Sequence, residues 1–168
     1  KLGTAGKVNP PLRSEVDVEI LWKNLGNVNF IASDHAPHTI KEKHRNVKDT
    51  AAGFPGVETT LPLLLNAANA EQLSWSELVR LTSGGASELF GLPQGIEVGN
   101  PANLVVLDRK KEQTIKADNL HSKCGWTPYE GQKVKGAVHK VFLRGELIVN
   151  GEEFTGKQGN GEEICQKL

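Results

Sequence analysis

Val28-Asn29-Phe30-Ile31-Ala32-Ser33 runs directly into Asp34-His35-Ala36-Pro37-His38, and this junction decides the expected fold. The first part is rich in β-forming, mostly apolar residues, which is typical of a strand buried in a parallel sheet. Upstream, Ser14 and Asp17 form a capping-box pattern, and apolar residues then recur at helical spacing until Gly26. The order of loop, helix and strand is that of a βα repeat and predicts an α/β fold.

The chain is expected to change character near Leu92. Before this point, helices are predicted over about 57–70, after the Ser74–Glu77 capping pattern and over 83–90, with a mobile polar loop at 41–50. After it, short strands are predicted at 103–108, 138–143 and 147–149, where turn signals separate apolar runs. We therefore expect two domains, residues 1–92 and residues 93–168.

Composition excludes several classes of partner. The 168 residues carry 20 Lys+Arg against 20 Asp+Glu, a net charge of zero, with no long basic run. This balance argues against a nucleic-acid or anionic-membrane partner, and no apolar stretch approaches the roughly 18–20 residues of a membrane span.

Cys124 and Cys165 are too few for a disulfide framework, which favours a reducing, cytoplasmic location. The chain lacks methionine and starts at Lys1, so we expect a larger protein that has lost its front.

The candidate chemistry lies at the carboxyl end of the predicted 28–33 strand, because active sites of βα folds gather at such ends. There the carboxylate of Asp34 can ligate a divalent metal and exchange a proton with metal-bound water. The imidazole of His38 can donate to an anionic ligand or bind a metal. The simpler interpretation is that Asp34 caps the next turn and the histidines are surface residues, and spacing alone does not separate the two.

Two further loops are candidates for the same rim. The prolines of Asn9-Pro10-Pro11-Leu12-Arg13 would hold an extended backbone and preorganise Asn9 and Arg13 to face a ligand. Gly53-Phe54-Pro55-Gly56, ahead of a helix, offers backbone N–H groups suited to anions or amide edges. Taken singly, the first is more simply a stiff connector and the second a plain turn.

Three motifs stand in the order found in one enzyme family: Lys7-Val8-Asn9-Pro10-Pro11-Leu12-Arg13, Ala32-Ser33-Asp34-His35-Ala36-Pro37-His38 and Gly53-Phe54-Pro55-Gly56-Val57-Glu58-Thr59. Together with 99–108 and 126–131, they make nearly the whole chain resemble the C-terminal part of a class I dihydroorotase, in the cyclic amidohydrolase superfamily. The resemblance implies the C-terminal portion of a TIM-type (β/α)8 metal-dependent hydrolase barrel followed by a small β-sandwich-like domain. A complete barrel takes about 250 residues, so the barrel would be incomplete in this chain.

The resemblance also implies roles for individual residues. Asp34 would be both a zinc ligand and the catalytic acid and base, Asn9 and His38 would bind dihydroorotate, and the backbone around Ala52 and Gly53 would hydrogen-bond its ring. The implied reaction is the reversible hydrolysis of the cyclic amide of dihydroorotate to N-carbamoyl-aspartate, a step of de novo pyrimidine biosynthesis. Its cofactor is one or two zinc ions, which suit a carboxylate ligand and hydrolytic chemistry.

The family's other zinc ligands have no counterpart here: a His-x-His pair, a carbamylated lysine and two further histidines would lie before Lys1. With one recognisable ligand, the isolated chain is predicted to be inactive. Its expected partner is the missing N-terminal part of the same enzyme, and a homo-oligomer is compatible with the sequence. Ser83-Gly84-Gly85-Ala86 replaces the family's usual Asn-Pro-Ala and is expected to alter a helix cap.

Three alternatives stay open. A hydantoinase or allantoinase would share the fold and the aspartate, although Asn9 and His38 favour a substrate that carries a carboxylate. A non-catalytic dihydroorotase-like protein could scaffold another enzyme. A stand-alone binding module would fold cooperatively and stay monodisperse, whereas a cut barrel would expose apolar edges and associate.

Overall fold

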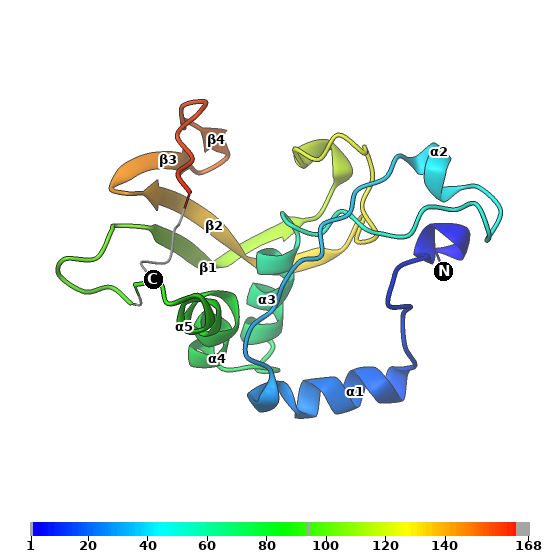
Figure 1. Ribbon diagram of the computed structural model, residues 1–168, viewed down its shortest axis with the longest axis horizontal. Helices are drawn as coiled ribbons and strands as arrows, with labels where there is room; N and C mark the ends of the chain where they lie inside the picture. Colours follow the sequence, from blue (N-terminus) through cyan, green and yellow to red (C-terminus); the bar gives the residue numbers. More distant parts are fainter. Residues whose placement is uncertain (1, 94, 164–168) are drawn as a thin grey trace.

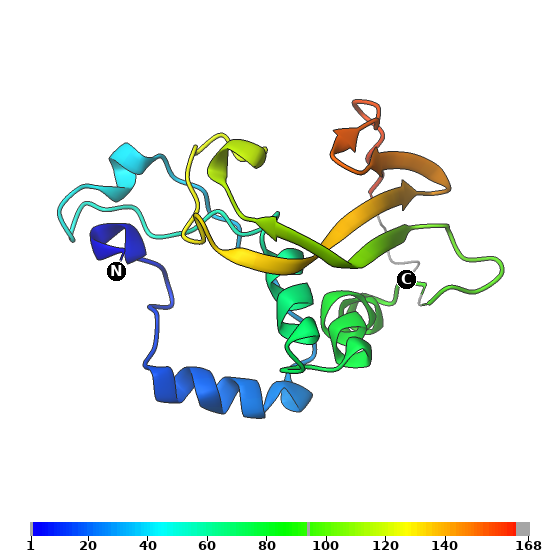
Figure 2. The same cartoon turned by 180° about the vertical axis from the view of Figure 1, so that it is seen from behind.

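The computed structural model describes residues 2–93 and 95–163. Lys1 and Cys165, on which two of the sequence arguments depend, lie outside the described residues. The first part of the chain consists of short helices and long connections: η1 (Gly3–Gly6), α1 (Glu15–Lys23), η2 (Leu25–Asn27) and α2 (Ile40–Lys43). In both views α1 lies on the side of the molecule opposite the sheet, and α2 lies close to η1 (Figures 1 and 2).

Helix α1 begins where the capping pattern predicts. Ser14 Oγ accepts a hydrogen bond from the Asp17 N–H at 3.3 Å, and the Asp17 carboxylate accepts one from the Ser14 N–H at 3.1 Å. None of the helix residues is buried, and Val18, Leu21 and Trp22 are exposed. The helix is therefore specified by its own ends and not by packing.

Helices α3 (Thr60–Asn69) and α4 (Trp75–Val79) confirm two of the predicted helices. The break expected before residue 83 is absent, because a π-helical turn, η3 (Arg80–Gly84), continues α4 into α5 (Gly85–Phe90). The prediction that 83–86 alters a helix cap is wrong, since these residues lie inside one continuous helical run. Within the described ranges, no helix is long and apolar enough to cross a membrane.

The predicted polar loop at 41–50 is interrupted by α2. The Thr39 N–H and Oγ1 both donate to the Glu42 carboxylate, at 2.7 and 2.8 Å, and so close a capping box. This local pairing starts a helix of one turn, which ends at Lys43. The helix places the Lys43 side chain beneath the neighbouring loops, where it is buried.

The second half of the chain forms one antiparallel sheet whose strands follow chain order: β1 (Leu104–Thr114), β2 (Lys133–Leu143), β3 (Glu146–Asn150) and β4 (Glu153–Phe154), with η4 (Ala117–Asn119) after β1. Strand β1 runs past its predicted end because Asp108 Oδ1 accepts the N–H groups of Lys110 and Lys111 across an irregularity, and pairing resumes at Glu112. The described strands make a single sheet, so the sandwich character of this region stays a prediction.

Residues 28–33 do not form the predicted strand. Their contacts are with helices instead: the Ile31 N–H donates to the Leu81 carbonyl at 2.8 Å, and the Arg80 guanidinium donates to the carbonyl of Val28. A strand needs a neighbouring strand for its ladder, and this segment has none among the described residues. The segment is therefore neither paired nor fully buried, although Val28 and Ile31 pack half-buried against the core.

The core lies between the helices and the sheet. Its buried members are Leu25, Leu64, Leu65, Ala67, Ala68, Leu73, Leu78 and Leu81. Helix α3 lies directly against β2 (Figure 1), and the Asn69 amide donates to the Lys135 carbonyl at 3.0 Å. The approach requires glycine, because a Cβ at Gly136 would lie 2.7 Å from that of Leu65.

Candidate active site

Asp34 lies directly after the 28–33 segment, as predicted, and its backbone conformation is unusual. Its φ is 45°, in the left-handed region that non-glycine residues seldom occupy. The residue is exposed, and its carboxylate has no hydrogen-bond donor among the described residues. Uncommon backbone conformations of this kind concentrate at functional sites. Asp34 therefore presents a free carboxylate from a constrained backbone position.

The segment that follows Asp34 pairs with the predicted glycine loop. The Ala36 N–H donates to the Phe54 carbonyl at 2.9 Å, and His35 and Phe54 form a parallel bridge. Gly53 has φ of +140°, and a Cβ there would lie 2.5 Å from the Ala36 carbonyl oxygen. Only glycine fits this contact, which brings the Ala52–Gly53 backbone against residues 34–38.

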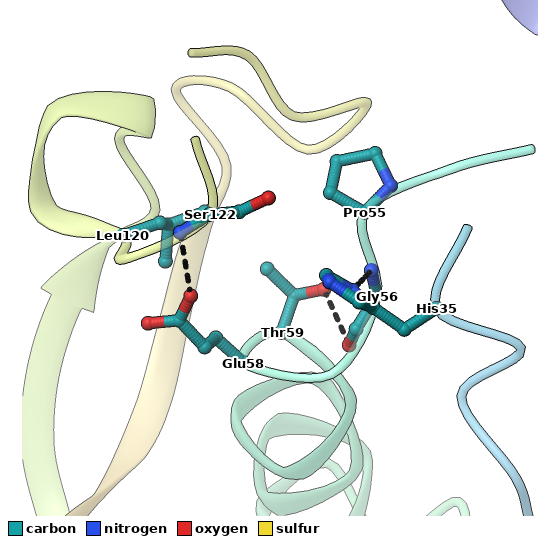
Figure 3. A pocket seen from close by; sticks show the side chains of 7 residues that line it. All are labelled: His35, Pro55, Gly56, Glu58, Thr59, Leu120 and Ser122. Atoms are coloured by element: carbon teal, nitrogen blue, oxygen red, sulfur yellow. Dashed lines mark hydrogen bonds between the residues drawn. The ribbon is translucent and has the colours of Figure 1, made fainter. Parts of the chain in front are cut away.

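The ring of His35 also connects the segment after Asp34 to the glycine loop. Nδ1 accepts hydrogen bonds from the backbone N–H groups of Gly56 and Val57, at 3.0 and 3.2 Å. Figure 3 shows the ring turned toward Gly56 ahead of α3. A nitrogen that accepts two hydrogen bonds carries no proton, so the neutral ring has its proton on Nε2. His35 therefore closes a turn, and its Nδ1 is not free for a metal.

The loop that carries Asn9 joins this assembly two residues upstream, at Lys7. The Gly53 N–H donates to the Lys7 carbonyl at 3.1 Å. The buried ammonium of Lys43 donates to that same carbonyl at 2.7 Å and to the carbonyls of Ala51 and Gly53 at 2.8 and 3.0 Å. Asn9 itself is exposed and precedes Pro10 through a cis peptide bond.

A segment from the second half of the chain closes over the loops. Trp126 Nε1 donates to the His38 carbonyl at 2.7 Å, and the Trp126 ring meets Phe54 edge-on with centroids 6.2 Å apart. Trp126 thus packs against the candidate site and is no member of the main core.

Glu58 makes a second connection to that segment. Its carboxylate accepts the backbone N–H group of Ser122 (Figure 3) and that of His121, and it contacts His121 Nδ1 at 2.8 Å. Burial raises the pKa of the Glu58 carboxyl, but the hydrogen bonds from His121 and Ser122 outweigh it, so the pKa lies below its usual value. The carboxylate therefore stays charged and anchors residues 121–122 to the start of α3.

These contacts unite the segments of all five predicted site residues. Asn9, Asp34, His38, Ala52 and Gly53 lie on three loops that hydrogen bonds through Lys7, Ala36 and Phe54 join. Sequence reasoning missed Lys43 and Glu58, which hold the assembly together. The available signal for Lys43 was the Thr39–Glu42 capping pattern, which marks the helical turn that buries it.

Asp34 fits one position of a zinc shell, since carboxylate oxygen is an accepted zinc ligand and its side chain is exposed and unpaired. The part of the chain that the structure describes contains no group of three or more His, Cys, Asp or Glu side chains arranged to hold a metal ion. The described residues therefore offer one side chain suited to zinc but not a complete shell.

Comparison with known proteins gives the family. Residues 11–148 match the amidohydrolase family. The chain belongs to the amidohydrolase family. It is 46% identical over 162 residues to the dihydroorotase of Pyrococcus furiosus and 44% identical over 158 residues to that of Archaeoglobus fulgidus. These alignments cover 96% and 93% of this chain but 38% of each dihydroorotase.

The fold is also found in solved amidohydrolases. The L-hydantoinase (dihydropyrimidinase) of Arthrobacter aurescens superposes with a TM-score of 0.89 at 32% identity, over 96% of this chain and 38% of that one. The chain thus spans less than half the length of the relatives that it matches in sequence and in structure. The predicted α/β amidohydrolase fold class is confirmed at this level.

Proposed function

We propose that these residues are the C-terminal part of a dihydroorotase, which catalyses the reversible hydrolysis of dihydroorotate to N-carbamoyl-aspartate in pyrimidine biosynthesis. The observation that carries the proposal is the union of three loops around Asp34: the Asn9 loop, residues 34–38 and the Ala52–Gly53 backbone. The 46% identity to a dihydroorotase supports the choice of substrate. A cytoplasmic location accompanies this function.

In this proposal residues 1–92 supply the last βα units of a TIM-type barrel and residues 93–168 a small β domain. The extended 28–33 segment would then gain its ladder from the barrel strands beside it. The exposed apolar residues of α1, among them Leu21 and Trp22, would be covered by the same additional structure. By itself the 168-residue chain should associate in solution, whereas a stand-alone module would be a monodisperse monomer.

Asp34 moves the proton. In the hydrolytic direction its carboxylate accepts a proton from the attacking water and delivers it to the ring nitrogen that leaves. Zinc, when bound, supplies a water of lowered pKa and polarises the amide carbonyl. Asn9 and His38 hold the carboxylate of dihydroorotate, and the backbone at Ala52 and Gly53 orients its cyclic amide by hydrogen bonds.

The isolated chain is inactive in this proposal, because Asp34 alone cannot hold zinc. Zinc titration and a dihydroorotate assay on the purified 168 residues test this point. The expected result is turnover below roughly one-thousandth of that of the intact protein, with no stoichiometric zinc binding, because the metal that activates water is not held. Turnover near that of the intact protein would contradict it.

Substrate choice is tested on the intact protein with dihydroorotate and hydantoin side by side. Two carboxylate-binding side chains should favour dihydroorotate by about a hundredfold in kcat/KM. Preference for hydantoin would move the protein to the hydantoinase class, whose solved members share its fold. No turnover of either substrate by the zinc-loaded protein would favour the non-catalytic scaffold.

A further inference from the structure

We propose that Lys43 is a positioning residue of this site: its ammonium fixes the backbone carbonyls of Ala51 and Gly53, the two neighbours of Ala52, and leaves the polar groups of Ala52 free for a substrate amide. The proposal deepens the proposed function and rests on it for the identity of the ligand. Lys43 itself touches neither substrate nor reacting atoms.

The ammonium uses its full hydrogen-bonding capacity on three backbone carbonyls. Nζ lies 2.7 Å from the Lys7 oxygen, 2.8 Å from that of Ala51 and 3.0 Å from that of Gly53. An ammonium has three donors, so none is left for another partner. The residue is 0% exposed, which places a charge beneath the loops and not on the surface.

No described carboxylate pairs with this charge. Its compensation comes from the three carbonyl dipoles and from the rings of Phe54 and Trp126, whose centroids lie 5.3 and 5.9 Å from Nζ. Burial and the nearby Lys7 ammonium lower the pKa of Lys43. Because no carboxylate neutralises the Lys43 ammonium, the loop carbonyls stabilise its charge. The ammonium in turn holds those carbonyls in place.

These hydrogen bonds fix the residues on both sides of Ala52. The Ala51 and Gly53 carbonyls are held by Lys43, and the Gly53 N–H is held by the Lys7 carbonyl at 3.1 Å. The N–H and C=O of Ala52 make no hydrogen bond to any of the described residues. A half-buried donor and acceptor with fixed neighbours are preorganised for a ligand that offers both groups, as a cyclic amide does.

The contact also polarises the donor. The Ala51 carbonyl and the Ala52 N–H belong to the same peptide group, so hydrogen bonding of the carbonyl to an ammonium strengthens the N–H at its other end. Lys43 therefore sets both the direction and the strength of the Ala52 N–H. The three acceptors of Lys43 lie on residues 7, 51 and 53 and not on residues 34–38, so proton transfer by Asp34 should not depend on Lys43.

The test replaces Lys43 in the intact protein to which these residues belong. Lys43→Met keeps most of the side-chain volume and removes the charge. We expect KM for dihydroorotate to rise about tenfold, because the N–H and C=O of Ala52 lose their fixed orientation toward the substrate amide, while kcat stays within about threefold. Amide exchange at Gly53 should accelerate about tenfold. Lys41→Met, an exposed lysine on the same helix, is the matched control and should change neither quantity.

An unchanged KM with unchanged Gly53 exchange would overturn the proposal, and so would a lower kcat at unchanged KM, which indicates only a smaller folded fraction. If Lys43→Met does not fold, Lys43→Arg decides: it keeps the charge but displaces the donors, so a raised KM supports the proposal and a wild-type KM overturns it. If the unaltered protein does not hydrolyse dihydroorotate, the proposed function fails, whereas the Gly53 exchange rate still decides the role of Lys43.

Discussion

Two regions of this molecule are held together by different physics. The core of α3, α4 and the sheet is built from apolar side chains such as Leu65 and Leu81, both 0% exposed. The candidate site is built from side chains that bind backbone, chiefly Lys43, His35 and Glu58. Apolar burial is non-directional and tolerates small shifts, whereas each of these polar contacts fixes one loop in one place.

The comparison teaches that stability and site geometry are separately encoded. Loss of a core side chain should lower the global free energy of unfolding and leave the loops in register while the protein stays folded. Loss of a loop contact should cost less global stability and release one segment. Variants in both regions test this distinction.

The largest expected effect is Leu65→Ala. Leu65 is fully buried in α3 against β2, so its truncation should lower the free energy of unfolding by about 3 kcal/mol through lost burial and a residual cavity. Urea unfolding of the intact protein to which these residues belong measures this. Leu89→Ala makes the same change at an exposed site and should cost less than about 0.5 kcal/mol. Equal losses for the two variants would show that the core is not where the structure places it.

A smaller effect is expected at a pair of adjacent glycines in the helical run. A Cβ at Gly85 would lie 1.9 Å from the Asn29 carbonyl oxygen, so Gly85→Ala should force the helix away from the 28–33 segment and cost about 2 kcal/mol. At Gly84 the nearest atom would be 4.0 Å away, and Gly84→Ala should stabilise the helix by about 0.5 kcal/mol. Thermal unfolding of both variants checks the opposite signs, and a loss for both would refute the close contact at Asn29.

The smallest effect is expected in the site region, at Glu58. Because its pKa in the folded chain is lowered, its contribution to stability is present above the unfolded pKa of about 4.3 and is lost as pH falls through the folded pKa. Glu58→Gln should therefore cost about 1 kcal/mol at pH 7 and less at pH 3. Urea midpoints at both pH values, with amide exchange at residues 121–122, provide the measurement. A difference that does not shrink in acid would contradict the assignment.

The sequence predicts the helices well because their signals are local. The Ser14 and Ser74 capping boxes mark the starts of α1 and α4, and the apolar spacing after Val57 indicates α3. The sequence predicts the structure less well where the pairing of strands determines it. Residues 28–33 carry strand-forming side chains but no ladder, and β1 extends beyond Asp108 because that side chain bridges an irregularity.

The candidate site likewise has a part that the sequence predicts and a part that it does not. The sequence indicates which loops carry Asn9, Asp34, His38, Ala52 and Gly53, since their motifs are contiguous. It does not show what joins the loops, because Lys43 looks like one more solvated charge in a polar stretch and His121 like an isolated histidine. Their roles depend on contacts with residues 8, 10, 36 and 63 positions away in the chain, which no helix or strand periodicity contains.

The most direct test of the proposed dihydroorotase site is the dihydroorotate turnover of the intact, zinc-loaded protein with Asp34→Asn. Asparagine keeps the shape but cannot carry the proton, so kcat should fall about 1,000-fold or more while the free energy of unfolding stays unchanged. Asp118→Asn, at another exposed aspartate, should retain full activity. Turnover by Asp34→Asn within about tenfold of the unaltered protein would contradict the catalytic role of Asp34 and, with it, the proposed site.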